Sequence, residues 1–297
     1  MARKMINTDK NSAYSFDAAH SKRVSYVLAT KNRAGFLESA LERAKELIGP
    51  DDELLLIDGG SNDNTLEIVK SFGNLVNVFV SEPDGNAYEA SNKGIMLARG
   101  RYIYLMSDDD IVYREGIEKA IEVLNRYSEI DLLVCGGMRK YGTKKLPYWL
   151  PPGTNYGSSP EDVFRYNACG MGFVYRQKTF AKFGLCNSVA ADGDFVARVI
   201  YQGGRVRFCR IYLFEHAIYP HSIINTRRRQ HQLARLRIAR EYCSRIFYLR
   251  YRLRVFLREG SFRRVYKRIH KFLKIRIFAS SARKRKKIEY IWDGGFS

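Results

Sequence analysis

The stretch VSYVLATKNRAGFLESALERAKELIGPDDELLLIDGG, residues 24–60, decides the fold because a helical pattern in it separates two strand patterns. Residues 24–30 and 53–58 are short apolar runs rich in strand formers, and each runs into polar residues. The segment between them repeats apolar residues at helical spacing: Leu37, Leu41, Ala44 and Ile48. A strand, a helix and a strand in this order predict two parallel strands joined by a crossover helix.

The same alternation continues toward the C-terminus. The expected segments are, in order, a helix carrying Leu66, Ile68 and Val69, a strand over 77–81, a helix over 87–100, a strand over 101–106, a helix carrying Ile117, Ile121 and Leu124, a strand over 131–137, a long connection over 147–160, a strand over 170–176 and a helix over 192–201. Alternating strands and helices predict an α/β fold with a mostly parallel central sheet and helices on both faces.

The net charge is unevenly distributed along the chain. Of the +20 over 297 residues, +19 lies in residues 221–297, which hold 23 basic and 4 acidic residues. Residues 1–220 hold 28 basic and 27 acidic residues, so this part is nearly neutral. The distribution argues against a uniformly basic protein that coats nucleic acid, and the hydrophobic fraction of 45% argues against a wholly disordered chain.

The cysteine pattern and the hydropathy of the chain indicate the cellular compartment. The five cysteines are scattered without a C-x-x-C pair, which suits a reducing compartment and argues against a structural zinc site or a disulfide framework. The opening residues lack an apolar signal core, so we expect a flexible polar leader over 1–22. The chain contains no run of 18 uncharged apolar residues, so a transmembrane helix is not expected. These features favour a cytoplasmic location.

Polar residues follow four of the expected strands. They are Thr30 and Asn32, then Asp58, then Glu82 and Asp84, and finally the triplet Asp108, Asp109 and Asp110. Because the carboxyl ends of parallel strands meet at one edge of a sheet, where ligands bind, these residues predict a single site. Carboxylates, together with substrate phosphates, are the usual ligands of Mg²⁺ and Mn²⁺, so the triplet predicts a metal site. The alternative is a solvated acidic turn that caps the next helix.

The segment IDGGSNDNT around Asp58 narrows the class of ligand. Its glycines permit a tight turn, and the Asp58 carboxylate could accept hydrogen bonds from a base or a ribose. The segment is not a G-x-G-x-x-G loop, and the chain contains no G-x-x-x-x-G-K-[ST] motif. Nicotinamide cofactors and P-loop ATPase chemistry are therefore disfavoured.

Four segments together resemble glycosyltransferase family 2, whose members have the GT-A fold. They are SYVLATKNRAGFL, LLLIDGGSNDNTLEIV, SEPDGNAYEASNKGIMLARGRYIYLMSDDDIV and VAADGDFVARV. The resemblance covers about residues 24–201 and implies transfer of a sugar from a nucleotide diphosphate donor with inversion at the anomeric carbon. It implies a GT-A catalytic domain over 23–220, with a nucleotide-binding half at 23–112 and an acceptor half at 113–220.

The resemblance also implies a set of nucleotide-binding residues: Thr30, Asn32, Asp58, Asp84, Asn92, Lys93 and Asp108. Within this set, Thr30 and Asp58 would contact the nucleoside. The acidic motif departs from the family's usual D-x-D-D or N-x-D-D, because the register puts Ser107 at the first acidic position. Asp109 is then the best candidate ligand of Mn²⁺ or Mg²⁺, and Asp110 is the second.

Asp192 matches the catalytic base of the family, and Asp194, two residues on, is the alternative base. Without a catalytic role, Asp192 would be a helix N-cap. A carboxylate here would take the proton of the acceptor hydroxyl as it attacks C1, while the metal offsets charge on the leaving diphosphate. His221 could approach the metal or the phosphates, although a loop histidine is the simpler interpretation. The Q-x-x-R-W motif of processive synthases is absent, which favours addition of single sugars.

The C-terminal region, residues 221–297, is expected to form basic amphipathic helices. Its two apolar stripes, separated at Gly260, are Ile246, Leu249, Leu253, Phe256 and Leu257, and then Phe262, Val265, Tyr266, Ile269, Phe272 and Leu273. Cationic residues beside both stripes are typical of helices that lie on an anionic membrane surface. The alternatives are packing of the stripes on the body and binding of nucleic acid, for which the chain carries no module signature.

We therefore expect a metal-dependent, inverting glycosyltransferase that moves a single sugar to a hydroxyl of a lipid-linked or cell-envelope glycan. UDP-sugars are the commonest donors of the family and are the expected donor. The enzyme would act at the cytoplasmic face of the cell membrane as a peripheral protein. The alternative from another class is a non-catalytic nucleotide-binding or basic nucleic-acid-binding protein on a GT-A-like scaffold.

Overall fold

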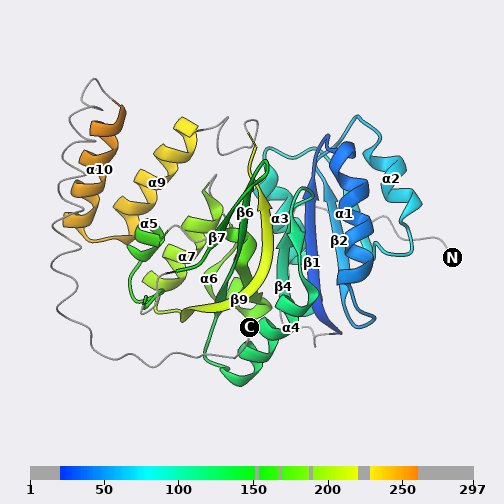
Figure 1. Cartoon of the computed structure of the whole chain (residues 1–297), viewed down its shortest axis with the longest axis horizontal. Helices are drawn as coiled ribbons and strands as arrows, with labels where there is room; N and C mark the ends of the chain where they lie inside the picture. Colours follow the sequence, from blue (N-terminus) through cyan, green and yellow to red (C-terminus); the bar gives the residue numbers. More distant parts are fainter. Residues whose placement is uncertain (1–20, 151–153, 167–168, 187–189, 220–227, 260–297) are drawn as a thin grey trace.

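The structure is a computed structural model that describes residues 21–150, 154–166, 169–186, 190–219 and 228–259. Within these residues a nine-stranded sheet forms the middle layer, and helices cover both of its faces (Figure 1). The strand order is β3-β2-β1-β4-β8-β6-β9-β5, and β7 pairs with β6 outside this path. The α/β fold expected from the sequence, with helices on both faces of the sheet, is confirmed.

The N-terminal half of the sheet is parallel. Its elements are β1 (Lys22–Thr30), α1 (Ala34–Leu47), β2 (Glu53–Asp58), α2 (Thr65–Ser71), β3 (Val78–Ser81), α3 (Ala87–Leu97) and β4 (Gly100–Met106). β1 pairs with β2 and β4, and β2 pairs with β3, always in parallel. The four strands expected here are confirmed to within two residues. The helix expected to reach Gly100 ends at Leu97, because Gly100 is already the first residue of β4.

The second half of the sheet is mixed and holds elements that the sequence pattern missed. Its elements are β5 (Ile111–Val112), α4 (Arg114–Arg126), β6 (Leu132–Tyr141), β7 (Lys144–Tyr148), α5 (Asp162–Tyr166), the 3₁₀ turn η1 (Gly170–Gly172), β8 (Phe173–Arg176), α6 (Gln177–Phe183), α7 (Ala191–Tyr201) and β9 (Val206–Ala217). The expected connection over 147–160 is wrong at its start, where β7 pairs with β6 in a hairpin. β7 is exposed over most of its length and includes a proline, so its sequence lacks a strand pattern.

Strand directions bring several carboxyl ends to one edge of the sheet. β8 runs antiparallel to both β4 and β6, so β6 runs in the same direction as β4. β9 pairs with β6 in parallel and therefore ends at the same edge. The ends of β1, β2, β4, β6 and β9 thus share the edge at which ligands of open α/β sheets bind.

Two apolar cores, one on each face, hold the layers together. On one face, Tyr26 and Leu28 of β1 pack with residues of α1, α2 and α4. On the other, Val27 of β1 packs with residues of α3, α6, α7 and α9. Successive strand residues point to opposite faces, so a strand with helices on both sides is apolar throughout. All six residues of β2 are buried, as this arrangement requires.

Two helices extend the body on its C-terminal side, α9 (Arg228–Tyr242) and α10 (Arg245–Glu259) (Figure 1). α9 packs on α7, and the rings of Tyr242 and Tyr201 lie 5.6 Å apart. Helices were expected over residues 221–297. They are confirmed over α9 and α10, whereas the second apolar stripe, 262–273, lies outside the described residues. None of the helices described is long and apolar enough to cross a membrane.

Candidate active site

The acidic triplet follows β4 at the shared edge, and its first member is held by a guanidinium from the loop after β1. Arg33 Nε lies 2.7 and 2.8 Å from the two carboxylate oxygens of Asp108, and Arg33 Nη2 lies 2.8 Å from Asp109 Oδ2. Thr30 Oγ1 donates to Asp108 Oδ2 at 3.2 Å. Burial raises the pKa of Asp108, and the guanidinium only partly opposes this effect. Two carboxylates of the triplet therefore share one positive charge.

Asp109 accepts hydrogen bonds from three side chains. Besides Arg33, the hydroxyl groups of Ser107 and Tyr219 donate to its two carboxylate oxygens. Burial alone raises the pKa of Asp109, but these hydrogen bonds and the charge of Arg33 hold it below its usual value. Asp109 is therefore ionised, and its negative charge is available to a cation.

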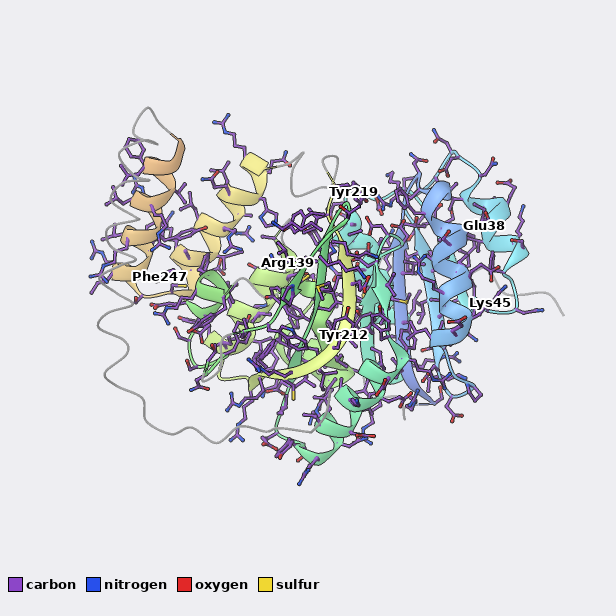
Figure 2. All side chains as sticks on the ribbon, in the orientation of Figure 1. Glu38, Lys45, Arg139, Tyr212, Tyr219 and Phe247 are labelled. Carbon is purple, nitrogen blue, oxygen red and sulfur yellow. The ribbon has the colours of Figure 1, made fainter. Side chains whose placement is uncertain are left out.

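Aromatic rings hold the Arg33 guanidinium in place. The guanidinium carbon lies 4.5 Å from the centre of the Phe36 ring, and Arg33 Nη2 donates to the Tyr219 hydroxyl at 3.0 Å. The rings of Phe36 and Tyr219 stack with centroids 6.1 Å apart. Tyr219, labelled in Figure 2, follows β9, so this cluster joins the loop after β1 to the segment after β9 beside the triplet.

Asp110 contacts a histidine that the sequence analysis did not single out. His216 Nδ1 lies 2.9 and 3.0 Å from the Asp110 oxygens, and the Ala217 backbone N–H donates to Asp110 at 2.8 Å. Burial alone lowers the pKa of His216, but the hydrogen bond and charge of Asp110 raise it above the usual value. In the sequence, the only indication of a role for His216 was its position near the end of the apolar strand β9, in FEHA. His221, the histidine that the sequence suggested near the metal, lies outside the described residues.

Asp192 of α7 interacts electrostatically with the same histidine. It lies in the first turn of α7, which begins at Ala191, so it is not the helix N-cap. Asp192 as a whole residue is exposed, yet desolvation of its carboxyl by the surrounding protein raises the pKa, against the charge of His216 and a hydrogen bond from the Gly170 backbone. A Cβ atom on Gly170 would overlap the Asp192 carboxylate, so only glycine permits this approach.

Asp194, the alternative base, lies elsewhere. Its side chain is 1% exposed, and its Oδ1 is 3.9 Å from Arg237 Nη2 of α9. Burial raises the pKa of Asp194, opposed by the charges of Arg198 and Arg237. Asp194 therefore belongs to the contact between α7 and α9, and this geometry favours Asp192 as the candidate base.

The polar residues after β1, β2 and β3 form a second group beside the triplet. The buried Asp58 carboxylate accepts hydrogen bonds from the Ser61 backbone at 3.0 and 3.2 Å and from the Ser81 hydroxyl at 2.6 Å. The Asp84 carboxylate lies against Gly59 and 3.3 Å from Lys31 Nζ. These contacts hold two carboxylates close to the strand ends, where the sequence predicted a nucleoside site.

Three other predicted nucleotide-binding residues make contacts within the protein. Asn32 has a φ of 51°, and its side chain accepts from the Asn62 backbone at 2.9 Å, which joins the loops after β1 and β2. The Asn92 amide both donates to and accepts from the Cys186 backbone, at 2.7 and 3.0 Å. Lys93 pairs with Glu82 at 2.8 Å. Asn92 and Lys93 thus connect α3 to its neighbours, and their roles toward a nucleotide stay predictions.

Arg139 is a further cation near the site that the sequence analysis missed. Arg139, labelled in Figure 2, lies on β6. It is in register with His216 of β9, and its guanidinium is 5.0 Å from the centre of the Tyr148 ring. Its Nε atom is buried without a hydrogen-bond partner among the described residues. A buried N–H without a partner is costly and suits a site that an anion enters.

The donor set of the triplet fits a divalent cation. Asp109 and Asp110 would supply carboxylate oxygens and His216 an imidazole nitrogen, which are ligand types that Mn²⁺ accepts, whereas Mg²⁺ prefers the oxygens. Among the described residues, no three Asp, Glu, His or Cys side chains form a ready-made cage. Such ions commonly bind through one or two carboxylates and complete their coordination with substrate phosphates. The Arg33 guanidinium already places a positive charge between Asp108 and Asp109.

Known proteins are similar to this chain in sequence. The chain is 28% identical over 145 residues to an uncharacterised glycosyltransferase of Rickettsia typhi, an overlap that covers 48% of this chain and 45% of the relative. It is 29% identical over 186 residues to a PGL/p-HBAD biosynthesis glycosyltransferase of Mycobacterium tuberculosis H37Rv, covering 59% and 68%. The chain thus spans less than half the length of the first of these relatives.

Solved structures share the fold. S. aureus TarS 1-349, in complex with UDP-GlcNAc, aligns with a TM-score of 0.57 at 17% identity over 74% of this chain and 66% of that TarS fragment. The mannosyltransferase PcManGT of Pyrobaculum calidifontis, in complex with GDP-Man and Mn²⁺, aligns with a TM-score of 0.56 at 17% identity, covering 72% and 64%. The model of glycosyl transferase family 2 matches residues 25–184, more than half of the chain. The four motifs, the shared edge of strand ends and this match agree: the chain belongs to glycosyl transferase family 2 and has the GT-A fold.

Proposed function

We propose that this protein transfers a single sugar from a nucleotide-diphosphate sugar to an acceptor hydroxyl, with inversion at the anomeric carbon. The observation that carries the proposal is the meeting of three groups at one sheet edge. These are the triplet after β4, His216 at the end of β9 and Asp192 in α7. Membership of the family supports the same reaction.

The donor would lie across the ends of β1, β2 and β4. Thr30, Asp58 and Asp84 would contact the nucleoside side of the donor, next to Asp108. Asn32, Asn92 and Lys93 would act by shaping the surrounding loops and α3, because their side chains bind protein groups here. A UDP-sugar is our proposed donor; TarS is in complex with UDP-GlcNAc and PcManGT with GDP-Man, so both bases belong in a test.

Asp109 and Asp110, with His216 beside them, would hold a Mn²⁺ or Mg²⁺ ion. Such an ion supplies positive charge to the diphosphate as it leaves. Arg33 would then hold Asp108 while Asp109 turns toward the ion. The buried Nε of Arg139 offers a further donor to an anionic group of the donor or the acceptor.

Asp192 would be the base. As the acceptor oxygen forms its bond to C1, the bond from C1 to the diphosphate oxygen breaks, and the hydroxyl proton passes to the Asp192 carboxylate. One displacement of this kind inverts the configuration. The raised pKa of Asp192 makes it a stronger base than an ordinary aspartate and brings its proton affinity nearer to that of a working base at neutral pH.

The acceptor would be a lipid-linked or cell-envelope glycan met at the cytoplasmic face of the membrane. The charge distribution supports this proposal, because the nearly neutral catalytic body continues into a C-terminal region of 23 basic and 4 acidic residues. Such a region brings a soluble active site to an acceptor held in an anionic lipid surface.

A donor screen followed by a transfer assay tests the proposed function. We expect UDP-sugars or GDP-sugars to raise the melting temperature in the presence of Mn²⁺, and the best donor to be consumed with release of its nucleoside diphosphate. Consumption should disappear in Asp109→Ala and persist in Glu38→Gln, an exposed carboxylate on α1. Salt-dependent binding of nucleic acid without binding of any sugar nucleotide would overturn the proposal in favour of the non-catalytic alternative.

A further inference from the structure

Among the residues that the structure describes, helix α10 packs on the body through one face. Phe247 and Tyr251 face inward, and their rings lie 5.5 and 4.9 Å from the ring of Phe164 in α5. Arg235 of α9 donates from Nε to the Tyr251 hydroxyl at 3.2 Å. These contacts place an aromatic seam between α10 and its neighbours, so the orientation of the helix about its own axis is defined.

The opposite face of α10 is an exposed apolar stripe, made of Ile246, Leu249, Leu253 and Phe256. The exposed fractions of these side chains are 65%, 51%, 57% and 66% in the same order. Their spacing of three and four residues puts them on one side of the helix. For these four side chains the alternative of packing on the body is wrong, because they are exposed and the body contacts Phe247 and Tyr251 instead.

Arginines border the stripe on both sides. At 100° per residue, Arg250 and Arg254 lie along one border of the stripe, and Arg245 and Arg252 lie along the other. All four side chains are exposed. The only acidic residue in α10 is Glu259 at its end. An apolar stripe between two cationic borders matches the cross-section of a lipid leaflet, with acyl chains below and phosphates at the level of the arginines.

Charge decides between the occupants that could cover this stripe. A second copy of α10 would bring arginine borders against arginine borders. The segment beyond Gly260 holds 12 basic and 2 acidic residues, so covering the stripe with it would also add positive charge to positive charge. Anionic lipid supplies the apolar and the negative component together.

We infer that α10 is a membrane-docking surface, which binds anionic lipid through the stripe Ile246, Leu249, Leu253 and Phe256 and through the four arginines beside it. The lipid contact itself does not depend on the proposed transferase activity. Only its purpose, to bring the active site to a lipid-linked acceptor, rests on that function.

Vesicle binding by the full-length protein tests this inference. The vesicles consist of phosphatidylcholine alone or of phosphatidylcholine with phosphatidylglycerol. We expect binding to the mixed vesicles that weakens with salt, and little binding to phosphatidylcholine alone. Arg250→Gln with Arg254→Gln should weaken binding about 25-fold, from roughly fivefold for each cation near the surface. Leu249→Ser with Leu253→Ser should weaken it at least as much, because the apolar contact is lost.

Matched controls separate this surface from general charge and apolar exposure. Lys178→Gln with Arg210→Gln removes two exposed cations from the body, and Leu66→Ser with Leu146→Ser removes two exposed apolar side chains. Both control pairs should bind the mixed vesicles within about twofold of the parent protein. Donor binding should be unchanged in all four double variants, so a failure of the transferase proposal would appear in that readout and not in vesicle binding.

A direct readout of insertion complements partitioning. Phe256→Trp places an indole in the stripe at a position that is exposed and makes no core contact, so the fold should tolerate it. Its emission should shift to shorter wavelength with the mixed vesicles and be quenched by brominated lipid. Unchanged vesicle binding in both α10 double variants, or a dimer in solution that the Leu249→Ser with Leu253→Ser variant dissociates, would overturn the inference.

Discussion

Arg33 donates from Nε to both carboxylate oxygens of Asp108, at 2.7 and 2.8 Å, across 75 residues of sequence. The same guanidinium reaches Asp109, so a side chain of the protein occupies the space between two carboxylates of the candidate metal site. At the proposed metal site, a divalent ion would therefore compete with Arg33 for Asp109. The affinity of that site for metal would then depend on the loop after β1 as well as on the triplet.

Arg33→Gln should strengthen the binding of Mn²⁺ in the absence of donor by roughly tenfold, because a nearby positive charge is removed. The variant should also lose about 1–3 kcal/mol of unfolding free energy without metal, since Asp108 keeps its buried charge and loses its partner. Mn²⁺ titration by electron paramagnetic resonance and urea unfolding measure the two effects. Lys45→Gln, an exposed cation on α1, is the control. Equal Mn²⁺ affinity in Arg33→Gln and the parent would contradict the competition.

Asp192→Asn should lower kcat by roughly 10²–10⁴-fold and leave donor affinity unchanged, because a base acts on the acceptor hydroxyl only as the bond forms. Asp194→Asn should keep most of kcat and lose stability, because Asp194 is buried against Arg237 of α9. Steady-state kinetics and thermal unfolding of both variants provide the comparison. The assignment fails if Asp194→Asn is the inactive variant and Asp192→Asn turns over normally.

Gly170→Ala should reduce kcat by roughly 10²-fold while the donor still binds, because the new methyl group displaces the Asp192 carboxylate. Gly35→Ala is a matched control, since a Cβ atom there meets nothing within 4 Å. Donor titration and transfer rates on both variants test this. Normal turnover in Gly170→Ala would show that the position of Asp192 is not critical.

Acid should destabilise the fold through Glu215. Burial alone would raise the pKa of Glu215, but hydrogen bonds from Lys140, Tyr212 and Tyr113 lower it from 4.5 to about 2. A carboxyl with a lowered folded-state pKa stabilises the fold above its unfolded pKa, and the stabilisation is lost as pH falls from 4.5 toward 2. We expect a loss of about 1–3 kcal/mol over this range.

Urea unfolding as a function of pH measures this contribution. Glu215→Gln should be less stable than the parent near pH 6, and the difference should narrow as the pH falls toward 2. Glu122→Gln, an exposed carboxylate on α4, should keep the pH dependence of the parent. A constant difference between Glu215→Gln and the parent across the whole range would exclude Glu215 as the source.

The sheet shows why sequence prediction succeeded in one half and not in the other. β1, β2, β3 and β4 are fully or largely apolar because helices cover both faces, so each can be recognised from its own residues. β7 is an exposed strand that exists through its pairing with β6. An exposed strand of this kind has a weak hydrophobic pattern in its own sequence, so it is recognised only from its pairing with the neighbouring strand.

The candidate site shows the same division between local and long-range information. The triplet, Asp58 and Asp84 were predictable because each follows a strand that its own sequence defines. The contacts of Arg33 and His216 were not, because the sequence around each residue does not indicate which distant carboxylate it meets. Arg33 meets Asp108 from 75 residues away, and His216 meets Asp110 from 106 residues away.

The sequence by itself determined the α/β class, the family motifs, the acidic strand ends and the basic C-terminal region, because hydrophobic period and residue chemistry are local properties of the chain. Only the tertiary structure decided which cation meets the triplet, because the pairing of β6 with β9 carries His216 to Asp110 and the turn after β1 carries Arg33 to Asp108. It also decided which face of α10 is bare, since the packing of Phe247 and Tyr251 on Phe164 turns the leucines outward. Contacts between distant segments depend on how the layers pack, and no short stretch of sequence contains that information.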